Sequence, residues 1–280
     1  ITCFSQPGAG GTLKWKTVVD GQPSAFSAPA SAYALPTIAT LDNSFLLHTS
    51  GTNGQRKEVI SITGANFGPS GGYAIEGLYG ADLRGRPYVA PCTLTADHVA
   101  VECTTAPGTG KNHAWRLRVA KTASANQTSL AGSPNTTSYR RPIVTAVRGI
   151  GARSANTEGG QQVVLDGSEF GPAGSVIEAT YRSPAGNVYT AVKCSVEVPH
   201  AQAECQTAPG TGRDLVWSLE VGAQVSDACM NTKTSYGAPF VSAIKGDGSF
   251  DAVTPGGQTV IVTGGNFGPA WLGTLDNVTY

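Results

Sequence analysis

The sequence carries little charge. Only 14% of its 280 residues are charged, against about 25% in an average soluble chain. Lysine plus arginine number 19 and aspartate plus glutamate number 19, so the formal net charge is zero. Proteins that bind nucleic acids or anionic membrane surfaces without sequence preference depend largely on positive charge. We therefore expect no nucleic-acid partner for this chain.

Long apolar segments are also missing. The sequence contains no run of about 18 apolar residues and no basic, apolar leader, so we expect no direct membrane insertion by this segment. The 36 glycines keep no three-residue period, which excludes a collagen helix. Hydrophobic residues make up 40% of the chain and recur throughout it, which favours a packed core over wholesale disorder.

Catalytic motifs are scarce as well. No H-E-x-x-H pair or recurring acid pair occurs, and the four histidines are scattered. We therefore expect no enzyme activity. His98 and His200 each precede a glutamate, Glu102 or Glu204, by four residues, but positions four apart on a strand lie ~13 Å apart, too far to share a metal ion. We expect both histidines to be solvent-facing strand residues.

One acidic segment offers oxygen ligands for calcium. Residues 247–251 contain Asp247, Ser249 and Asp251 at alternate positions, but the rest of an EF-hand loop is missing. We expect no cofactor, and calcium is the alternative.

Six cysteines are present, and four of them form two pairs with the same spacing of 11 residues: Cys92 with Cys103, and Cys194 with Cys205. Neither a C-x-x-C motif nor a set of His and Cys ligands accompanies them, which disfavours zinc. Two disulfides in an oxidising compartment are the preferred interpretation. Two free buried thiols in each domain are the alternative.

Three sequence markers recur with a period of about 100 residues. One is a phenylalanine followed by glycine and proline, at Phe67, Phe170 and Phe267. The second is a cysteine followed twelve positions later by a tryptophan, at Cys3 and Trp15, Cys103 and Trp115, and Cys205 and Trp217. The third is a tyrosine three positions before a proline, at Tyr33 and Pro36, Tyr139 and Pro142, and Tyr236 and Pro239.

The markers follow one another in the same order, so we expect the sequence to cover part of a tandem array of similar units. Ile1 corresponds to Val101, and Tyr280 falls near the position of Tyr79. The predicted domains are 1–35, the C-terminal part of a unit; 36–141 and 142–238, two complete units; and 239–280, the N-terminal part of a further unit.

Two cysteines stand outside the paired pattern. Cys229 has no counterpart in the other complete unit, so we expect it to be either buried or available to another chain. Cys3 occupies the position of the paired Cys103, and its partner is expected upstream of Ile1.

Short segments rich in β-branched and aromatic residues alternate with turns within each unit. The predicted strands include residues 58–63, 98–103, 115–119, 162–166 and 216–221. In one of them Val99, Val101 and Cys103 alternate with Ala100 and Glu102, which is typical of a sheet buried on one face. About seven such strands per unit, with a disulfide and an inward tryptophan, predict an immunoglobulin-like antiparallel β-sandwich. The fold class is therefore all-β.

The recurrent Phe-Gly-Pro fits a buried aromatic residue at the end of a strand. The turn that follows needs the backbone freedom of glycine.

Three segments resemble the core signature of IPT/TIG domains: "VISITGANFG" at 59–68, "VVLDGSEFG" at 163–171 and "VIVTGGNFG" at 260–268. IPT/TIG domains are immunoglobulin-like modules of plexins, transcription factors and many surface proteins. The later "VECTTAP" and "AECQTAP" segments also resemble this family, and the resemblance covers nearly the whole chain. It departs at Asp166 and Glu169, where the other units have threonine and asparagine. The resemblance implies a fold and no chemistry.

The linkers between units are short. Two residues separate Tyr139 from Pro142, and two separate Tyr236 from Pro239. A proline fixes its own φ and biases the preceding residue to extended conformations. The junctions therefore predict units arranged end to end as a rod, each adding about 35–45 Å. Flexible beads are the alternative.

Three N-glycosylation sequons begin at Asn126, Asn135 and Asn277. Together with the expected disulfides they indicate an extracellular or cell-surface location, where N-linked glycans supply the hydration that the weakly charged surface lacks.

The expected function is structural. We expect a glycosylated, extracellular tandem IPT/TIG array that forms or coats a surface fibril or appendage, for adhesion or mechanical spacing, with neighbouring copies of itself as partners. The alternative is the ectodomain of a cell-surface receptor or adhesion protein that binds a protein or glycan ligand. DNA binding conflicts with the zero net charge, the tandem units and the paired cysteines.

Overall fold

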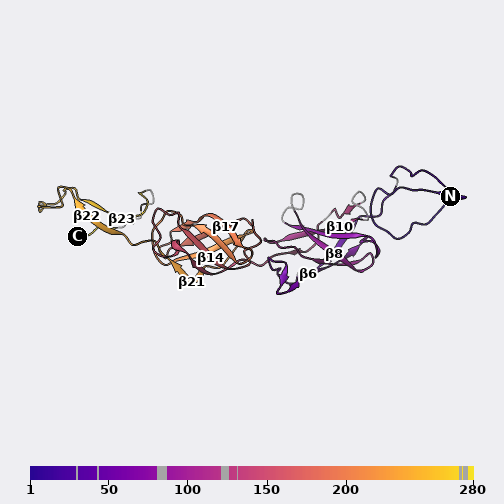
Figure 1. Ribbon diagram of the computed structural model, residues 1–280, viewed down its shortest axis with the longest axis horizontal. Helices are drawn as coiled ribbons and strands as arrows, with labels where there is room; N and C mark the ends of the chain where they lie inside the picture. The colour runs from indigo at the N-terminus through magenta and orange to yellow at the C-terminus, as the bar shows by residue number, and fades with distance from the viewer. Residues whose placement is uncertain are drawn as a thin grey trace. The chain divides into compact units, whose positions relative to one another are not determined.

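The computed structural model describes residues 1–29, 31–42, 44–80, 87–120, 126–130, 132–270, 273 and 277–280. The chain divides into two units, Ile1–Arg140 and Arg141–Tyr280, and Figure 1 labels some of their strands. Almost all regular structure in the described residues is β, apart from a short 3-10 helix, η2 (Ile150–Ala152). The predicted all-β class is confirmed.

The first unit is built on an eight-stranded antiparallel sheet. The strands follow the order β11-β10-β7-β8-β9-β6-β3, and β12 also pairs with β10, on the edge opposite β7. Their bounds are β3 (Thr37–Leu41), β6 (Val59–Ala65), β7 (Ala74–Gly80), β8 (Tyr88–Ala96), β9 (Ala100–Thr104), β10 (His113–Ala120), β11 (Gln127–Thr128) and β12 (Thr136–Thr137).

The second unit divides the same order of pairing between two sheets. One runs β13-β14-β18-β17, and the other runs β16-β15-β19-β20 with β21 also on β19. The bounds are β13 (Ile143–Arg148), β14 (Gln162–Ser168), β15 (Ile177–Arg182), β16 (Val188–Thr190), β17 (Val192–Val198), β18 (Gln202–Gln206), β19 (Leu215–Val221), β20 (Gln224–Val225) and β21 (Cys229–Thr234). In the first unit one long strand, β8, pairs with both β7 and β9. In the second unit two strands replace it: β16 pairs with β15, and β17 pairs with β18.

Each unit has its own core around a tryptophan. Trp115 and Trp217 are fully buried, and each stacks on a tyrosine of the adjacent strand, Tyr79 or Tyr181, with ring centroids 4.1 Å apart. The core of the second unit draws side chains from both of its sheets. Two sheets over one shared core make a β-sandwich.

Three smaller hairpins complete the described strands. They are β1 (Val18–Val19) with β2 (Gln22–Pro23), β4 (Thr52–Asn53) with β5 (Arg56–Lys57), and β22 (Phe240–Lys245) with β23 (Ile261–Gly265). The pairs β3–β6, β13–β14 and β22–β23 each show a register shift at the same place, after Ile38, Val144 and Val241. The three copies of the sequence repeat therefore share even the position of this register shift.

The Phe-Gly-Pro marker plays the part that its residues indicate. Phe67 and Phe170 are fully buried just after β6 and β14. Gly68 and Gly171 follow with φ of 88° and 83°, in the left-handed region that glycine adopts at little cost. The interpretation of a buried aromatic residue followed by a glycine turn is confirmed for both.

The prediction for the two histidines is wrong. His98 and His200 are half-buried and lie in the turns before β9 and β18, each with φ of 66°. Each turn holds the Phe-Gly loop, since His98 N donates to Gly68 O and Phe67 N donates to His98 O. Val99 lies in the same turn and is exposed, whereas Val101 and Cys103 on β9 are buried as expected.

Candidate functional site: unit boundaries and sequon asparagines

The four evenly spaced cysteines form two disulfides. Cys92 on β8 is bonded to Cys103 on β9, and Cys194 on β17 is bonded to Cys205 on β18. These are the pairs that the sequence predicts, and each ties two adjacent strands of one unit. Cys3 is free and exposed, so its predicted partner is not among the residues of this chain that the structure describes.

Cys229 is free and buried. It lies on β21 opposite Trp217 of β19. Of the two alternatives that the sequence leaves open for this cysteine, the structure shows burial.

A cluster of tyrosine hydroxyls closes each unit, and we call it the tyrosine clamp. In the first unit Tyr139 Oη donates to the carbonyl of Ala106 (2.7 Å) and lies 2.7 Å from Tyr79 Oη. The amide of Ala106 donates to Tyr79 Oη (2.8 Å). The clamp therefore joins β7, the loop after β9 and the chain just before the next unit.

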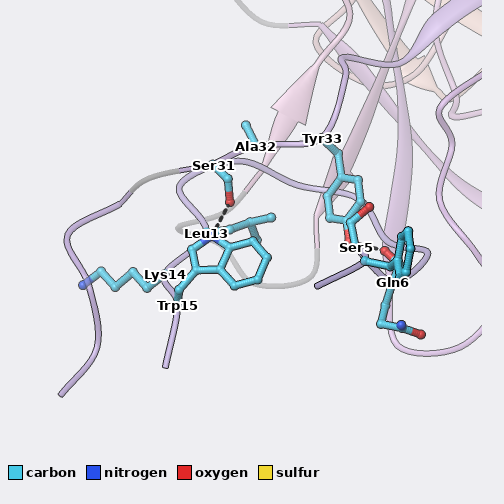
Figure 2. A pocket seen from close by; sticks show the side chains of 9 residues that line it. Ser5, Gln6, Leu13, Lys14, Trp15, Ser31, Ala32 and Tyr33 are labelled. Atoms are coloured by element: carbon cyan, nitrogen blue, oxygen red, sulfur yellow. Dashed lines mark hydrogen bonds between the residues drawn. The ribbon is translucent and has the colours of Figure 1, made fainter. Parts of the chain in front are cut away.

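The second unit repeats the clamp with different residue numbers and the same bonds. Tyr236 Oη donates to the carbonyl of Ala208 (2.6 Å) and lies 2.6 Å from Tyr181 Oη. The amide of Ala208 donates to Tyr181 Oη (2.9 Å). Near the start of the chain, Tyr33 Oη donates to the carbonyl of Gln6 (2.5 Å; Figure 2). This bond corresponds to the bond from Tyr139 to Ala106 and to the bond from Tyr236 to Ala208.

The glycine that follows each clamp carbonyl by two positions leaves room for the closing tyrosine. A Cβ built on Gly8, Gly108 or Gly210 would lie 2.6–2.7 Å from the hydroxyl oxygen of Tyr33, Tyr139 or Tyr236, respectively. Real Cβ atoms do not approach so closely. The hydroxyl end of the closing tyrosine therefore packs against the glycine of the recurrent Pro-Gly turn.

Burial keeps the clamp hydroxyls protonated. Desolvation raises the pKa of Tyr79 to about 12, and it also raises the pKa of Tyr139, Tyr181 and Tyr236. A protonated phenol can donate a hydrogen bond, and a phenolate cannot. The clamps are therefore hydrogen-bonding structures at neutral pH and show no sign of acid–base tuning toward pH 7.

Side-chain amides hold two predicted module boundaries. Asn66 Nδ2 donates to the carbonyl of Leu35, and Asn266 Nδ2 donates to the carbonyl of Ala238, both at 3.0 Å. Each of these carbonyls belongs to the residue before a junction proline. The corresponding residue of the second complete unit is Glu169, whose carboxylate cannot donate in this way when ionised.

A glutamine adds a second contact at the first of these boundaries. Gly10 N donates to Gln127 Oε1 (3.1 Å), and Gln127 Nε2 donates to the carbonyl of Tyr33 (2.7 Å). Both side-chain groups of one residue on β11 therefore bind the 1–35 segment, which gives that segment a defined position against the following module.

The second departure from the repeat, Asp166, forms an ion pair. Arg148 Nε donates to Asp166 Oδ2 (2.7 Å), and Gln202 Nε2 donates to Oδ1 (2.9 Å). The hydrogen bond from Arg148 lowers the pKa of Asp166. In the first unit the same place holds a hydroxyl contact between Thr40 and Thr63, so the pairing of the two strands is supported by different chemistry in each unit.

The three sequon asparagines, Asn126, Asn135 and Asn277, are exposed. Asn126 immediately precedes β11 and Asn135 immediately precedes β12. Both strands pair with β10 at the edge of the sheet. Glycans on these two asparagines would therefore stand at a sheet edge.

The acidic segment suggested for calcium lies in the loop between β22 and β23. Asp247 and Asp251 are exposed. Within the described ranges, no three His, Cys, Asp or Glu side chains gather closely enough to hold a metal ion. The described ranges also contain no helix with the length and hydropathy needed to cross a membrane.

No protein-family model matches the chain, and no curated protein matches it. Among solved structures, the chain is similar to the full extracellular region of plexin A4 at 13% identity and a TM-score of 0.30, over 72% of this chain and 18% of that one. It is also similar to InvD of Yersinia pseudotuberculosis at 11% identity and a TM-score of 0.25, over 71% and 59% of the two chains. The chain spans less than two thirds of either structure.

Sequence reasoning missed the tyrosine clamps and the junction asparagines. The repeat contained a signal for the clamp, because the closing tyrosine and the Pro-Gly turn recur with one period. Their contact depends on tertiary structure, since Ala106 and Tyr139 are 33 positions apart in the sequence. Tyr79 and Tyr181, which complete the clamps, belong to strands that the sequence did not single out.

Proposed function

We propose that this chain is a segment of a structural extracellular protein in which IPT/TIG-like sandwiches follow one another in tandem as a rod. The protein would form or coat a surface fibril or appendage and provide adhesion or mechanical spacing. Its role is non-catalytic, and its partners are neighbouring copies of itself.

The observation that carries this proposal is that the same structural contacts recur from unit to unit. A binding protein would instead show one distinctive site. The clamp bond from a closing tyrosine to a loop carbonyl occurs three times. The amide bond to a pre-proline carbonyl occurs twice. Contacts that recur with the repeat serve the array, and they fix the residues next to each linker.

Location outside the cell is supported by the two disulfides, because such bonds persist in oxidising compartments. The exposed sequons at the β11 and β12 edge support glycosylation. An unprotected edge strand invites pairing with another chain, so glycans at Asn126 and Asn135 would limit lateral association on this side.

Small-angle X-ray scattering of the glycosylated chain tests the rod. The maximum dimension is expected to increase by about 35–45 Å for each unit present, when the full chain is compared with residues 36–280 and 142–280. A maximum dimension that stays nearly constant as units are added would contradict the proposal.

Peptide mass spectrometry tests the glycans separately. We expect Asn126, Asn135 and Asn277 to carry N-linked sugars when the chain is secreted by a eukaryotic host. Unmodified peptides at all three positions, in a preparation whose control glycoprotein is modified, would remove glycosylation from the proposal while leaving the rod untouched.

A further inference from the structure

Each complete unit brings the chain that enters it beside the chain that leaves it. In the first unit, Leu47 N donates to the carbonyl of Ser138 (2.9 Å), and Arg140 N donates to the carbonyl of Leu47 (2.7 Å). The two segments run in the same direction, with Leu47 and Tyr139 paired in parallel. The strand that precedes Leu47, β3, pairs with β6 in the antiparallel sense instead. The parallel contact therefore joins the two ends of the unit directly.

The second unit has the same contact, made by different residues. Ala155 N donates to the carbonyl of Ser235 (2.8 Å), and Gly237 N donates to the carbonyl of Ala155 (2.7 Å). Ala155 and Tyr236 are paired in parallel. Leucine has become alanine here and arginine has become glycine, while both backbone bonds remain. The contact is therefore a property of the fold and does not depend on one side chain.

The loop that carries the clamp carbonyl bonds both segments. In the first unit it accepts from the leaving chain twice, from Tyr139 Oη at the carbonyl of Ala106 (2.7 Å) and from Tyr139 N at the carbonyl of Gly110 (2.9 Å). It also donates to the entering chain, from Gly108 N to the carbonyl of Thr49 (2.8 Å). The equivalent backbone bonds of the second unit run from Tyr236 N to the carbonyl of Gly212 and from Gly210 N to the carbonyl of Thr157, both at 2.9 Å.

Parallel pairing decides how these bonds respond to tension. When the two ends of a unit are pulled apart, the entering segment is drawn toward its start and the leaving segment toward its end. Because the two segments run in the same direction, they slide past each other along their length. The hydrogen bonds between them lie across this direction, so they share the force and must break together. An antiparallel pair pulled from one end would instead open one bond at a time.

We propose that the parallel contact and the tyrosine clamp together form a crosslink by which each complete unit withstands tension applied through its two ends. Leu47 and Tyr139 are fully buried, and a hydrogen bond that breaks in a buried place leaves polar groups without a partner. The inference rests on the proposed function, since a structural array is what would place the units under tension. It goes beyond spacing, because it names the bonds that resist the force.

Single-molecule force spectroscopy of the 280-residue chain, held at its two ends, tests the crosslink. We expect two abrupt unfolding steps, one for each complete unit. The segments closed by the two disulfides span 11 positions each and cannot extend while the bonds are intact. Reduction should therefore lengthen each step by about 35–40 Å, at about 3.3–3.6 Å per residue. This change identifies the steps as the unfolding of the two units.

Tyr139→Phe removes one hydroxyl from the crosslink. At constant force we expect it to shorten the lifetime of one step by roughly two- to tenfold, which corresponds to the loss of one net hydrogen bond. The other step should not change, so each molecule contains its own reference. Tyr236→Phe should act in the same way on the other step, and it provides a second test if the first variant does not fold.

Tyr88→Phe is the matched control. The Tyr88 hydroxyl accepts from Thr109 N (3.0 Å) and donates to the carbonyl of Thr109 (3.2 Å). It therefore joins β8 to the same loop and lies outside the contact between the entering and leaving chains. Contacts that persist until the crosslink has broken have little effect on the unfolding rate, so the lifetime should stay within about twofold of the wild type. Urea denaturation shows separately that each variant is folded and how much equilibrium stability it has lost.

Two results would overturn the inference. One is a wild-type chain that extends gradually, without abrupt steps. The other is a step that Tyr139→Phe and Tyr88→Phe shorten alike, since the crosslink would then have no special part in resisting force. If the maximum dimension in scattering still grows with each unit, the rod of the proposed function survives either failure. If that dimension stays constant while the steps are abrupt, the proposed function fails and the crosslink remains.

Discussion

At the residue scale, the position of the closing tyrosine in each unit depends on a distant glycine, which has no side chain to occupy the same space. Gly108 contributes only backbone, yet Tyr139 Oη occupies the place that its Cβ would need. The buried hydroxyl in turn satisfies the carbonyl of Ala106, and a buried carbonyl without a partner is costly. Glycine and tyrosine therefore act as a pair, although 31 positions separate them.

Gly108→Ala tests this dependence. The added methyl group must displace Tyr88, Tyr139 or the loop, and we expect the free energy of unfolding of the first unit to fall by about 1–3 kcal/mol, as is usual for overpacking. Urea denaturation measures the loss. Gly11→Ala is the control, since a Cβ there meets Gln127 at an ordinary contact distance of 3.6 Å. Equal stability of the two variants would contradict the account of the clamp.

The clamp also predicts sensitivity to alkali. The pKa of Tyr79 in the folded chain is raised to about 12, above the value of about 10 for an exposed tyrosine. A raised folded-state pKa stabilises the protein fully below the unfolded value and progressively less as pH rises toward the folded value. We therefore expect the stability contributed by Tyr79 to be constant below about pH 10 and to be lost between about pH 10 and 12.

Stability measured by denaturant at a series of alkaline pH values checks this expectation, with tyrosinate absorbance followed in parallel. Tyr79→Phe should lower stability at neutral pH and make its decline above pH 10 shallower. If Tyr79 ionised near pH 10 while the chain remained folded, the clamp would not be buried as described.

At the element scale, the disulfides join neighbouring strands that are already paired. Cys92 and Cys103 lie directly opposite each other on β8 and β9. Their contribution therefore comes from restricting the unfolded chain more than from creating a new contact between strands.

Removing this disulfide by Cys92→Ser and Cys103→Ser together is expected to cost about 2–3 kcal/mol, from the closure entropy of a loop of 11 residues. Chemical denaturation under non-reducing conditions measures the change. Cys3→Ser is the control, because Cys3 is free and exposed. A double variant as stable as this control would show that the crosslink contributes nothing.

Strands were the most predictable part of the fold. The segment 115–119 lies within β10, and 162–166 lies within β14, because short segments rich in β-branched and aromatic residues favour strands. The prediction failed at 98–103, where the strand begins at Ala100. His98 has a left-handed backbone, which a pattern of side-chain polarity cannot reveal. The repeat contained the closing tyrosines and the Pro-Gly turns of the clamps, but the contacts between them were not predictable, since they join residues distant in sequence.

At the scale of the whole molecule, the two units have separate hydrophobic cores. The buried residues of each cluster come from one unit only. Cooperative unfolding requires shared contacts, so each unit is expected to unfold as its own transition.

Calorimetry of matched variants tests this independence. Gly108→Ala and Gly210→Ala place the same methyl group in the same local setting, one in each unit. Each is expected to lower the temperature of a different transition by several degrees, about 2–8 °C per kcal/mol, and to leave the other transition unchanged. A single transition that both variants shift alike would show that the two units unfold together.

The buried thiol of Cys229 has a practical consequence. Only an exposed thiolate reacts with alkylating reagents, so Cys3 should take up a maleimide at once, whereas Cys229 reacts only after β21 separates from Trp217. The second increment in mass then arrives at the pace of local opening. The rate at which Cys229 is alkylated therefore measures local opening of the second β-sandwich without any engineered label.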